Sequence, residues 1–341
     1  MSKILLTGAS GHLGANLLQR LLSDGADVRV LLREGSNNRA VDGLPVERVY
    51  GDLRSPDAVR AAVQGCTRIY HAAAQISTLY GDPALKRSIF DSNVLGTRHL
   101  LEAAARAGVE RVVVTSSLGA VGYREDDPSH PSDEESPFYP FHRTMPYEAS
   151  KAFVEHECLR AVARGLDVRI AVSTAILGPH DWKPSRMGRA LCDFANGRLR
   201  AYIDGGVEFV AASDLVQGHT LAMDRGQPGE KYIFSTEFAT LPDLMWMWHE
   251  ITGRPIPRLR LPAPVMGAIA EVLSPLLTRL APQFPQRLTP SAVRILQLRR
   301  HVDTGKAQRA LGYRPTGIRA ACEQAYQFHI QRGAIKQGAA R

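Results

Sequence analysis

The first fourteen residues hold the feature that most restricts how this chain can fold. The short apolar run Lys3–Thr7 predicts a buried parallel strand, and a turn with three glycines follows it directly. Leucines at helical spacing from Leu13 onward predict that this turn opens a helix. Gly8 would permit the tight turn, Gly11 would let the backbone approach a pyrophosphate, and Gly14 would let the helix pack closely. Because exposed amides and the helix dipole favour an anion, the motif predicts a dinucleotide-binding fold.

Apolar runs and helical patterns alternate through the first half of the chain. They predict further strands at 27–33, 47–50, 68–71, 111–116 and 167–173, with a long helix ending near 107 and another over 147–164. Repeated units of this kind form an α/β fold, in which helices cover both faces of a doubly wound parallel sheet. The strict alternation stops after Gly178, and the loop over 124–140, rich in acid and proline, is expected to be solvated.

The ends of three predicted strands suggest how a dinucleotide would be held. Strand 27–33 ends in Arg33, where an NAD-binding fold usually presents a carboxylate to the ribose hydroxyls. A guanidinium matches a 2′-phosphate, so NADP(H) is favoured over NAD(H), unless Arg33 is only a solvated residue at a strand end. Asp52 follows the next strand and could accept a hydrogen bond from an adenine amino group. The small residues over 72–74 would let a cofactor lie close, or would only pack beneath a helix.

A tyrosine and a lysine four residues apart, Tyr147 and Lys151, lie on one face of a predicted helix. This spacing alone is weak, but Ser117 follows a predicted buried strand, and the glycine turn supplies the context. Hydride transfer to a carbonyl leaves an oxyanion, to which Tyr147 would give a proton while Ser117 donates a hydrogen bond. The Lys151 ammonium, together with a positively charged nicotinamide, would lower the tyrosine pKa, and Lys151 could also hold the nicotinamide ribose. These residues predict a Ser–Tyr–Lys catalytic group.

Eight short motifs that span nearly the whole chain resemble the extended short-chain dehydrogenase/reductase superfamily. The motifs are Thr-Gly-Ala-Ser-Gly-His-Leu-Gly at 7–14, Gly-Asp-Leu at 51–53, His-Ala-Ala-Ala at 71–74, Asn-Val-Leu-Gly-Thr at 93–97, Thr-Ser-Ser at 115–117, Tyr147 with Lys151, Gly-Pro at 178–179 and Leu-Gly-Tyr-Arg-Pro at 311–315. Within the superfamily, Arg33, the segment 181–185 and the tail look most like the dihydroflavonol-reductase and 3β-hydroxysteroid-dehydrogenase branch. Bacterial members of that branch often carry the general name NAD-dependent epimerase/dehydratase.

The resemblance implies a set of site residues, with Ser117, Tyr147 and Lys151 as the catalytic group. The implied cofactor contacts are Gly8, Ser10, Gly11, His12, Leu13, Gly14, Arg33, Asp52, Leu53, Ala72, Ala73, Ala74, Thr115, Ser116, Tyr147, Lys151, Ser173 and Ile176. The expected substrate contacts are Ile76, Ser117, Tyr147, Gly178 and Trp182. Two positions depart from the family pattern: His12 replaces a bulky apolar residue, and Val172-Ser173 stands where Arg-Pro or Asn-Pro is common.

The resemblance also implies an organisation for the chain. Residues 1–177, with interleaved later segments near 205–235, would form a dinucleotide-binding Rossmann domain. Residues 178–335 would form mainly a smaller α/β substrate-binding domain. Many members form homodimers through the helix near 85–107 and the helix that carries the catalytic tyrosine, so we expect a homodimer.

Composition excludes several other classes of protein. The net charge of +8 is spread along the chain with no basic block and interleaved aromatics, which argues against nucleic-acid binding. The four cysteines are far apart without a Cys-x-x-Cys spacing, so we expect no metal site and reduced thiols in the cytoplasm. The start leaves no room for a signal peptide, and no apolar run reaches the roughly eighteen residues of a spanning helix. The amphipathic stretch 265–280 could rest on a membrane surface, although a lid or packing role is favoured.

The residues therefore predict an NADP(H)-dependent oxidoreductase that interconverts a ketone or aldehyde and an alcohol on a partly apolar small molecule. One alternative is a nucleotide-sugar epimerase with tightly bound NAD. A dehydratase is disfavoured, because Leu118-Gly119 stands where dehydratases carry a threonine and an acidic residue. The other alternative is a nucleotide-binding regulatory protein without turnover, which would usually have lost part of the Ser–Tyr–Lys group.

Overall fold

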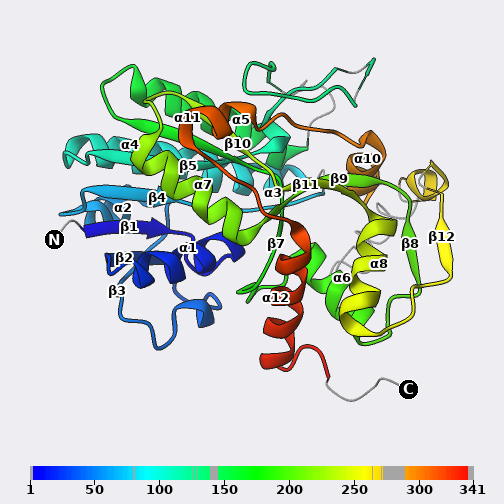
Figure 1. The fold of residues 1–341 in the computed structure, drawn as a ribbon. Coiled ribbons are helices and arrows are strands. Elements are labelled where there is room, and N and C mark those ends of the chain that lie inside the picture. The colour runs from blue at the N-terminus through cyan, green and yellow to red at the C-terminus, as the bar shows by residue number, and fades with distance from the viewer. Residues whose placement is uncertain are drawn as a thin grey trace.

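The computed structural model describes residues 3–79, 81–124, 126–127, 129–138, 145–262, 264–269, 271 and 289–336. Its main feature is a seven-stranded sheet with the strand order β10-β6-β5-β4-β1-β2-β3, in which every neighbouring pair is parallel (Figure 1). The strands are β1 (Lys3–Thr7), β2 (Asp27–Leu32), β3 (Glu47–Tyr50), β4 (Arg68–His71), β5 (Arg111–Ser117), β6 (Val168–Ser173) and β10 (Lys231–Phe234). The sheet confirms the predicted α/β Rossmann fold.

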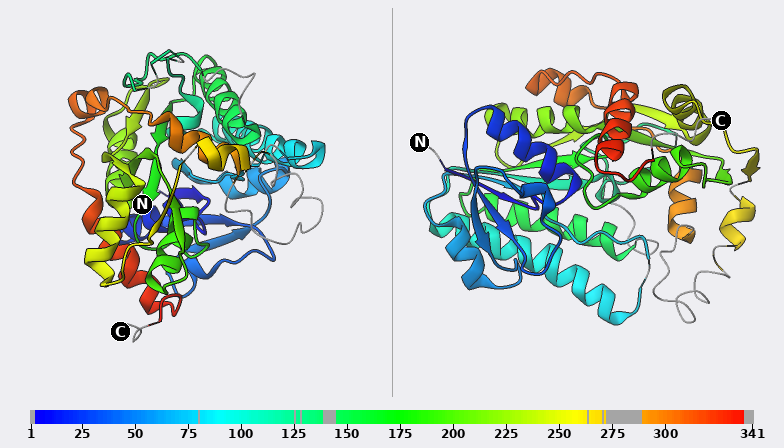
Figure 2. Two further views of the ribbon diagram at one scale, coloured as in Figure 1. Left: turned by 90° about the vertical axis from the view of Figure 1, so that its right-hand side faces the viewer. Right: turned by 90° about the horizontal axis from the view of Figure 1, so that it is seen from below.

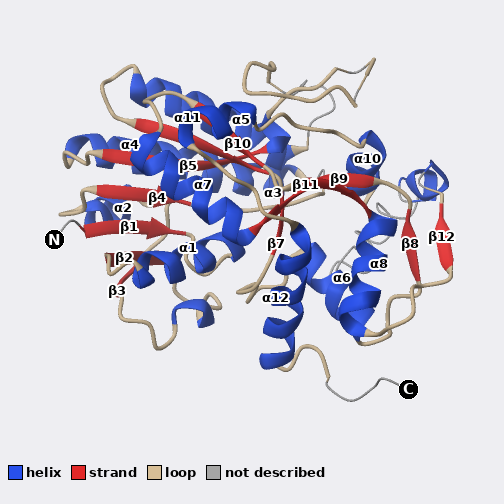
Figure 3. Ribbon diagram, in the orientation of Figure 1, coloured by secondary structure: helices blue, strands red, loops and turns tan. Residues whose placement is uncertain are grey.

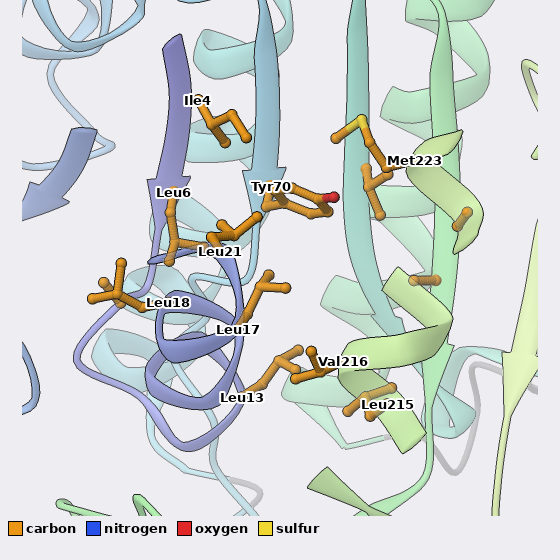
Figure 4. Close-up of a cluster of buried hydrophobic side chains, with 14 of the residues drawn as sticks. Ile4, Leu6, Leu13, Leu17, Leu18, Leu21, Tyr70, Leu215, Val216 and Met223 are labelled. Carbon is orange, nitrogen blue, oxygen red and sulfur yellow. The ribbon is translucent and has the colours of Figure 1, made fainter. Parts of the chain in front are cut away.

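Helices cover both faces of this sheet because its strands are apolar on both sides. Ile4 and Leu6 of β1 point into one core, shared with α1 (His12–Ser23), α7 (Ala212–Arg225) and α11 (Gly305–Leu311). Leu5 points into the opposite core, shared with α2 (Pro56–Val63), α4 (Gly96–Arg106) and α5 (Pro146–Val162). Figure 4 shows the first core, in which Leu13 of α1 lies beside Val216 of α7. The helical leucine spacing of the sequence thus becomes the buried face of α1.

The strand order reverses between β1 and β4. From β1 the chain builds outward through β2 and β3, and it then returns to add β4, β5 and β6 on the other side. Ligands of open parallel sheets bind at such a reversal, beyond the carboxyl ends of the strands. The register Thr7 to His71 and Ser117 to Ser173 places the ends of β1, β4, β5 and β6 along one edge. That edge carries the site described below.

A second part of the molecule is built from smaller sheets and the C-terminal helices (Figures 2 and 3). Its strands are β7 (Ala175–Leu177), β9 (Gly206–Ala211) and β11 (Glu237–Thr240) in one sheet, and β8 (Ala201–Ile203) and β12 (Leu259–Leu261) in another. Its helices are α6 (Arg186–Ala195), α8 (Leu241–Thr252), α10 (Pro290–Leu298) and α12 (Ile318–Gln331). Phe194, Phe209 and Trp248 lie in its core. Segment 205–235 runs through both parts, since β9 pairs with β7 whereas β10 pairs with β6.

The long helix predicted to end near residue 107 is broken in the structure. It consists of α3 (Pro83–Phe90), a π-helical turn η2 (Asp91–Leu95) and α4, and Asn93 lies in the π turn. The π turn carries a buried amide side chain, that of Asn93, which bonds to groups outside the helix. Such turns occur often at functional sites. Two short 3₁₀ turns, η1 (Arg39–Val41) and η3 (Leu118–Ala120), complete the described elements.

The acidic loop over 124–140 is not wholly solvated, so that prediction is wrong for Glu134. This side chain is buried and accepts a hydrogen bond from the Ile233 amide at 2.7 Å. Burial raises the pKa of the Glu134 carboxyl, opposed by that bond. The loop is therefore fastened to β10 at the edge of the main sheet, which a charge count could not reveal.

Some other predictions concern segments that the structure describes only in part. Most of the amphipathic stretch 265–280 lies outside them. In the portion of the chain that the structure describes, no helix has both the length and the apolar character to cross a bilayer. Across the same portion, no three His, Cys, Asp or Glu side chains are placed to hold a metal ion. All four cysteines are described, and each is a buried free thiol.

Candidate active site

The glycine turn between β1 and α1 has the backbone geometry that its spacing indicates. Gly8 has φ +80°, and a Cβ atom there would lie 2.6 Å from the Ala72 carbonyl carbon. A Cβ at Gly14 would lie 2.1 Å from the Gly8 oxygen, so only glycine lets α1 approach the turn. Gly11 precedes α1 with no side-chain cap, which leaves amides at the helix N-terminus for an anion.

A cleft of about 510 Å³ lies beside this turn, within the usual size range of ligand pockets. Its lining contains the predicted cofactor residues Gly8, Ser10, Gly11, Arg33, Asp52, Leu53, Ala72, Ala73 and Ala74. It also contains residues that the sequence reasoning did not assign, among them Ser36, Arg54, Gln75, Ser88, Ser92 and Lys183. The shape and the cradle at Gly8 fit a dinucleotide that lies across the switch point of the sheet.

Three cationic side chains line the cleft, those of Arg33, Arg54 and Lys183. The Asp52 carboxylate is held by Arg54, with an Nη2–Oδ2 distance of 2.8 Å and an Nε–Oδ1 distance of 3.0 Å. These bonds engage both carboxylate oxygens, and they keep the pKa of Asp52 below its ordinary value. Arg33 lines the cleft with an exposed side chain. Lys183 reaches in from the loop between β7 and α6, and its Nζ donates to the Ser10 hydroxyl at 2.9 Å.

The opposite end of the turn is tied to the second part of the molecule. His12 Nε2 lies 3.2 Å from the Gly178 carbonyl oxygen, and Asn16 Nδ2 donates to the Pro179 oxygen at 2.8 Å. The polar ring of His12, unexpected for the family, thus bridges α1 and the loop after β7. Leu13 buries its side chain in the core against α7, so only its backbone can face a cofactor.

The predicted catalytic residues come together at the end of β5. Ser117 at the end of β5 lies beside Tyr147 of α5, and Lys151 lies one turn along α5 with its Nζ donating to the Thr115 oxygen at 2.7 Å. Burial raises the pKa of Tyr147 to about 12, opposed by Ser117, and burial lowers the pKa of Lys151 to about 8. The Lys151 ammonium is directed to a backbone carbonyl here, and its expected effect on the tyrosine pKa together with a bound nicotinamide stays a prediction.

Asn93 connects the cleft to α5, the helix that carries Tyr147, a role that the sequence reasoning missed. Its Nδ2 donates to the Gln75 oxygen at 3.0 Å and to Ser150 Oγ at 2.9 Å, and its Oδ1 accepts from the Gln75 amide at 2.7 Å. Ser150 in turn donates to the Tyr147 carbonyl at 2.7 Å. A polar amide inside an otherwise helical run was the available signal.

Several predicted cofactor residues use their side chains within the protein. Thr115 Oγ1 lies 2.9 Å from His219 Nε2 on α7, whereas the Ser116 hydroxyl donates to Glu155 on α5. Ser173 donates to the Thr174 oxygen at 2.9 Å, next to Ser117 in the β5–β6 register. A cofactor at this edge would therefore meet the backbone of these strands rather than the hydroxyls.

The four remaining predicted positions have different surroundings. Ile176 on β7 packs against the core that α1 and α7 share. Ile76 is 71% exposed, an apolar side chain beyond the end of β4. Trp182 packs edge-on against Phe328 of α12, with ring centroids 5.1 Å apart. Gly178 has φ +152°, and a Cβ there would lie 2.6 Å from the Ala212 Cβ, so this turn fits tightly on α7.

Comparison with known proteins gives one consistent result. The model of the NAD dependent epimerase/dehydratase family matches residues 4–234. The chain is 43% identical to sterol demethylase protein B of Methylococcus capsulatus, over 97% of this chain and 99% of that protein. It is 32% identical to a putative dihydroflavonol 4-reductase of Synechocystis sp., over 97% of this chain and 95% of that protein.

Solved structures agree. The crystal structure of gox2253 matches 98% of this chain and 100% of that chain, at 32% identity and a TM-score of 0.84. A UDP-glucose 4-epimerase from Thermotoga maritima shares the fold at 18% identity and a TM-score of 0.77, over 97% of this chain and 99% of that chain. The chain belongs to the NAD-dependent epimerase/dehydratase family, in the extended short-chain dehydrogenase/reductase superfamily, and is an NAD(P)-dependent oxidoreductase that acts on a CH–OH group.

Proposed function

We propose that the protein uses NADP(H) to interconvert a ketone or aldehyde and an alcohol on a largely apolar small molecule. The observation that carries this proposal is that Ser117 at the end of β5 lies beside Tyr147, with Lys151 one helical turn away on α5. The pair lies at the end of β5, and β5 adjoins β4, whose end opens into the cleft. Asn93 and Ser150 link the two places by hydrogen bonds.

The chemistry follows from the protonation states of these residues. The bound nicotinamide would supply or accept the hydride, and the Ala72–Ala73 end of β4 and the backbone of β5 would hold it. Because burial raises the pKa of Tyr147 to about 12, its phenol keeps its proton at neutral pH. Tyr147 is therefore suited to give a proton to a nascent alkoxide, with Ser117 donating a hydrogen bond to the same oxygen. In oxidation Tyr147 must take that proton, which requires a nearby positive charge to lower its pKa.

Two observations support NADP(H) over NAD(H). Arg33 stands at the end of β2, where NAD-binding folds usually present a carboxylate to the ribose. The carboxylate that does reach this end of the cleft, Asp52, is neutralised by Arg54. The local charge thus favours a ligand with a further phosphate.

The substrate class is proposed from the names of relatives. The 43% identical relative is named for sterol demethylation, and others are named for dihydroflavonols, 3β-hydroxysteroids and a farnesyl dihydroquinoline oxide. These are ring compounds with large apolar parts. We extend this class to the present chain, where the exposed Ile76 offers an apolar surface beyond β4.

A carbonyl screen tests the proposal. The protein is incubated with NADPH and with steroid ketones, flavanonols, alkyl ketones or nucleotide sugars, and the loss of NADPH absorbance is followed. We expect turnover with at least one apolar ring ketone. Copurified NAD together with nucleotide-sugar epimerisation, and no NADPH consumption, would instead support the epimerase. A homodimer also stays a prediction, which sedimentation velocity can check.

A further inference from the structure

The geometry points to a second phosphate-binding residue: we propose that Lys183 binds the 2′-phosphate of NADP(H) together with Arg33. The inference rests on the proposed use of NADP(H). Lys183 lies between β7 and α6, in the second part of the molecule, yet it lines the same cleft as the glycine turn. The cofactor would then be held from both sides.

The Lys183 side chain extends far enough to contact the glycine turn. Lys183 Nζ donates to the Ser10 hydroxyl at 2.9 Å, between residues 173 positions apart in the sequence. A lysine ammonium has three donors, so two remain for a ligand. The ammonium therefore already stands beside the turn where a dinucleotide would lie.

The charges around Lys183 favour the binding of an anion. Within the described part of the chain, no carboxylate forms an ion pair with Lys183 or Arg33, whereas Arg54 is paired with Asp52. Partial burial lowers the pKa of Lys183, and the charge of the nearby Arg33 lowers it further. Two neighbouring cations repel each other unless an anion lies between them. A phosphate monoester carries a charge of about −1.5 to −2 at neutral pH, which two cations balance.

The neighbours of Lys183 favour the 2′-phosphate over the pyrophosphate. The pyrophosphate has its own site in the amides at Gly11 and the N-terminus of α1. Arg33 follows β2, where this fold meets the adenosine ribose. Lys183 lines the same cleft as Arg33, so its ammonium can meet a phosphate on the ribose together with the Arg33 guanidinium.

The loop that carries Lys183 is fastened before any ligand binds. The Gly178 oxygen contacts His12, and the Pro179 oxygen accepts from Asn16, both on α1. The buried Asp181 carboxylate accepts from the Ser185 amide at 2.8 and 3.0 Å. A preorganised ammonium loses less freedom on binding, so its contribution to affinity should be substantial.

Calorimetric titration of the full chain with cofactor fragments tests this inference. The ligands are adenosine 2′,5′-bisphosphate, 5′-AMP, ADP, NADP⁺ and NAD⁺. We expect Lys183→Met to raise the Kd for the bisphosphate and NADP⁺ about tenfold, as for the loss of one charge-assisted bond. The other three ligands should change less than about twofold, and Lys183→Arg should recover most of the affinity. Lys336→Met, the same change on an exposed lysine, is the matched control.

The outcomes separate this inference from the proposed function. If the wild type binds the bisphosphate no better than 5′-AMP, the proposed preference for NADP(H) fails, and the role of Lys183 fails with it. If the wild type prefers the bisphosphate but Lys183→Met does not weaken it, only the role of Lys183 is refuted. Equal weakening of ADP and the bisphosphate would place Lys183 at the pyrophosphate and also refute it. Circular dichroism of each variant confirms that the chain is folded.

Discussion

Replacing Asn93 by leucine tests the link between the cleft and the catalytic helix. Asn93 is 1% exposed and makes hydrogen bonds to the Gln75 amide, the Gln75 oxygen and the Ser150 hydroxyl. Leucine has a similar size, so Asn93→Leu removes these bonds without a large cavity. Ser150, which donates to the Tyr147 carbonyl, would lose its own donor.

The expected size of the effect follows from these bonds. A buried hydrogen bond contributes about 1 kcal/mol net, and a partner left dry and unpaired costs about 1–3 kcal/mol. Asn93→Leu should therefore lower the free energy of unfolding by about 3 kcal/mol. Domains have stabilities of about 5–15 kcal/mol, so the variant should still fold. A displacement of Tyr147 near 1 Å would lower turnover by about a hundredfold.

Urea denaturation, followed by tryptophan fluorescence, measures the stability, and NADPH oxidation with the best ketone from the screen measures turnover. Asn196→Leu is the matched control, because Asn196 also makes three side-chain bonds, to Cys192, Ala334 and Lys336. The control should lose stability but keep its turnover within about twofold. Equal turnover in the two variants would refute the reasoning that Asn93 positions α5.

Two more predictions concern the turn and the buried histidines. Gly14→Ala would place a methyl 2.1 Å from the Gly8 oxygen, so NADPH affinity by fluorescence titration should fall more than about tenfold. Gly317→Ala, with no atom within 4 Å of the new methyl, should leave that affinity unchanged, and equal losses would contradict the role of the turn. Burial lowers the pKa of His71 to about 3 and of His219 to about 4, below the ordinary value near 6.5. As the pH falls, these histidines take up protons in the unfolded chain before they do so in the folded chain. The free energy of unfolding should therefore be highest above about pH 6.5 and fall toward pH 4, by about 1.4 kcal/mol per pH unit for each histidine. A urea midpoint that stays the same from pH 7.5 to 5 would contradict this.

Local sequence patterns predict much of the fold and part of the candidate site. The strand, turn and helix from Lys3 to Ser23 follow from apolar spacing and glycines, and the structure confirms them within a residue or two. Tyr147 and Lys151 share a helix face in any register, and Ser117 follows from the strand before it. These residues could be predicted from short-range geometry alone.

The missed residues depend on contacts between distant segments. Lys183 meets Ser10 across 173 positions, Asn93 meets Ser150 across 57, and Glu134 meets Ile233 across 99. Lys183 and Glu134 look like ordinary surface residues in their own segments, and the segment around Asn93 does not show which partner its amide would meet. The contact of the Lys151 ammonium is of the same kind, since its direction depends on where β5 presents the Thr115 oxygen.

The measurement that tests the central claim most directly is made on Tyr147→Phe. This change removes the phenolic oxygen and keeps the ring, so NADPH binding by fluorescence should stay within about twofold of the wild type. Single-turnover reduction of the best ketone from the screen should slow by about a hundredfold or more, because no group replaces the proton donor. Unchanged turnover with intact NADPH binding would contradict the assignment of Ser117, Tyr147 and Lys151 as the catalytic group.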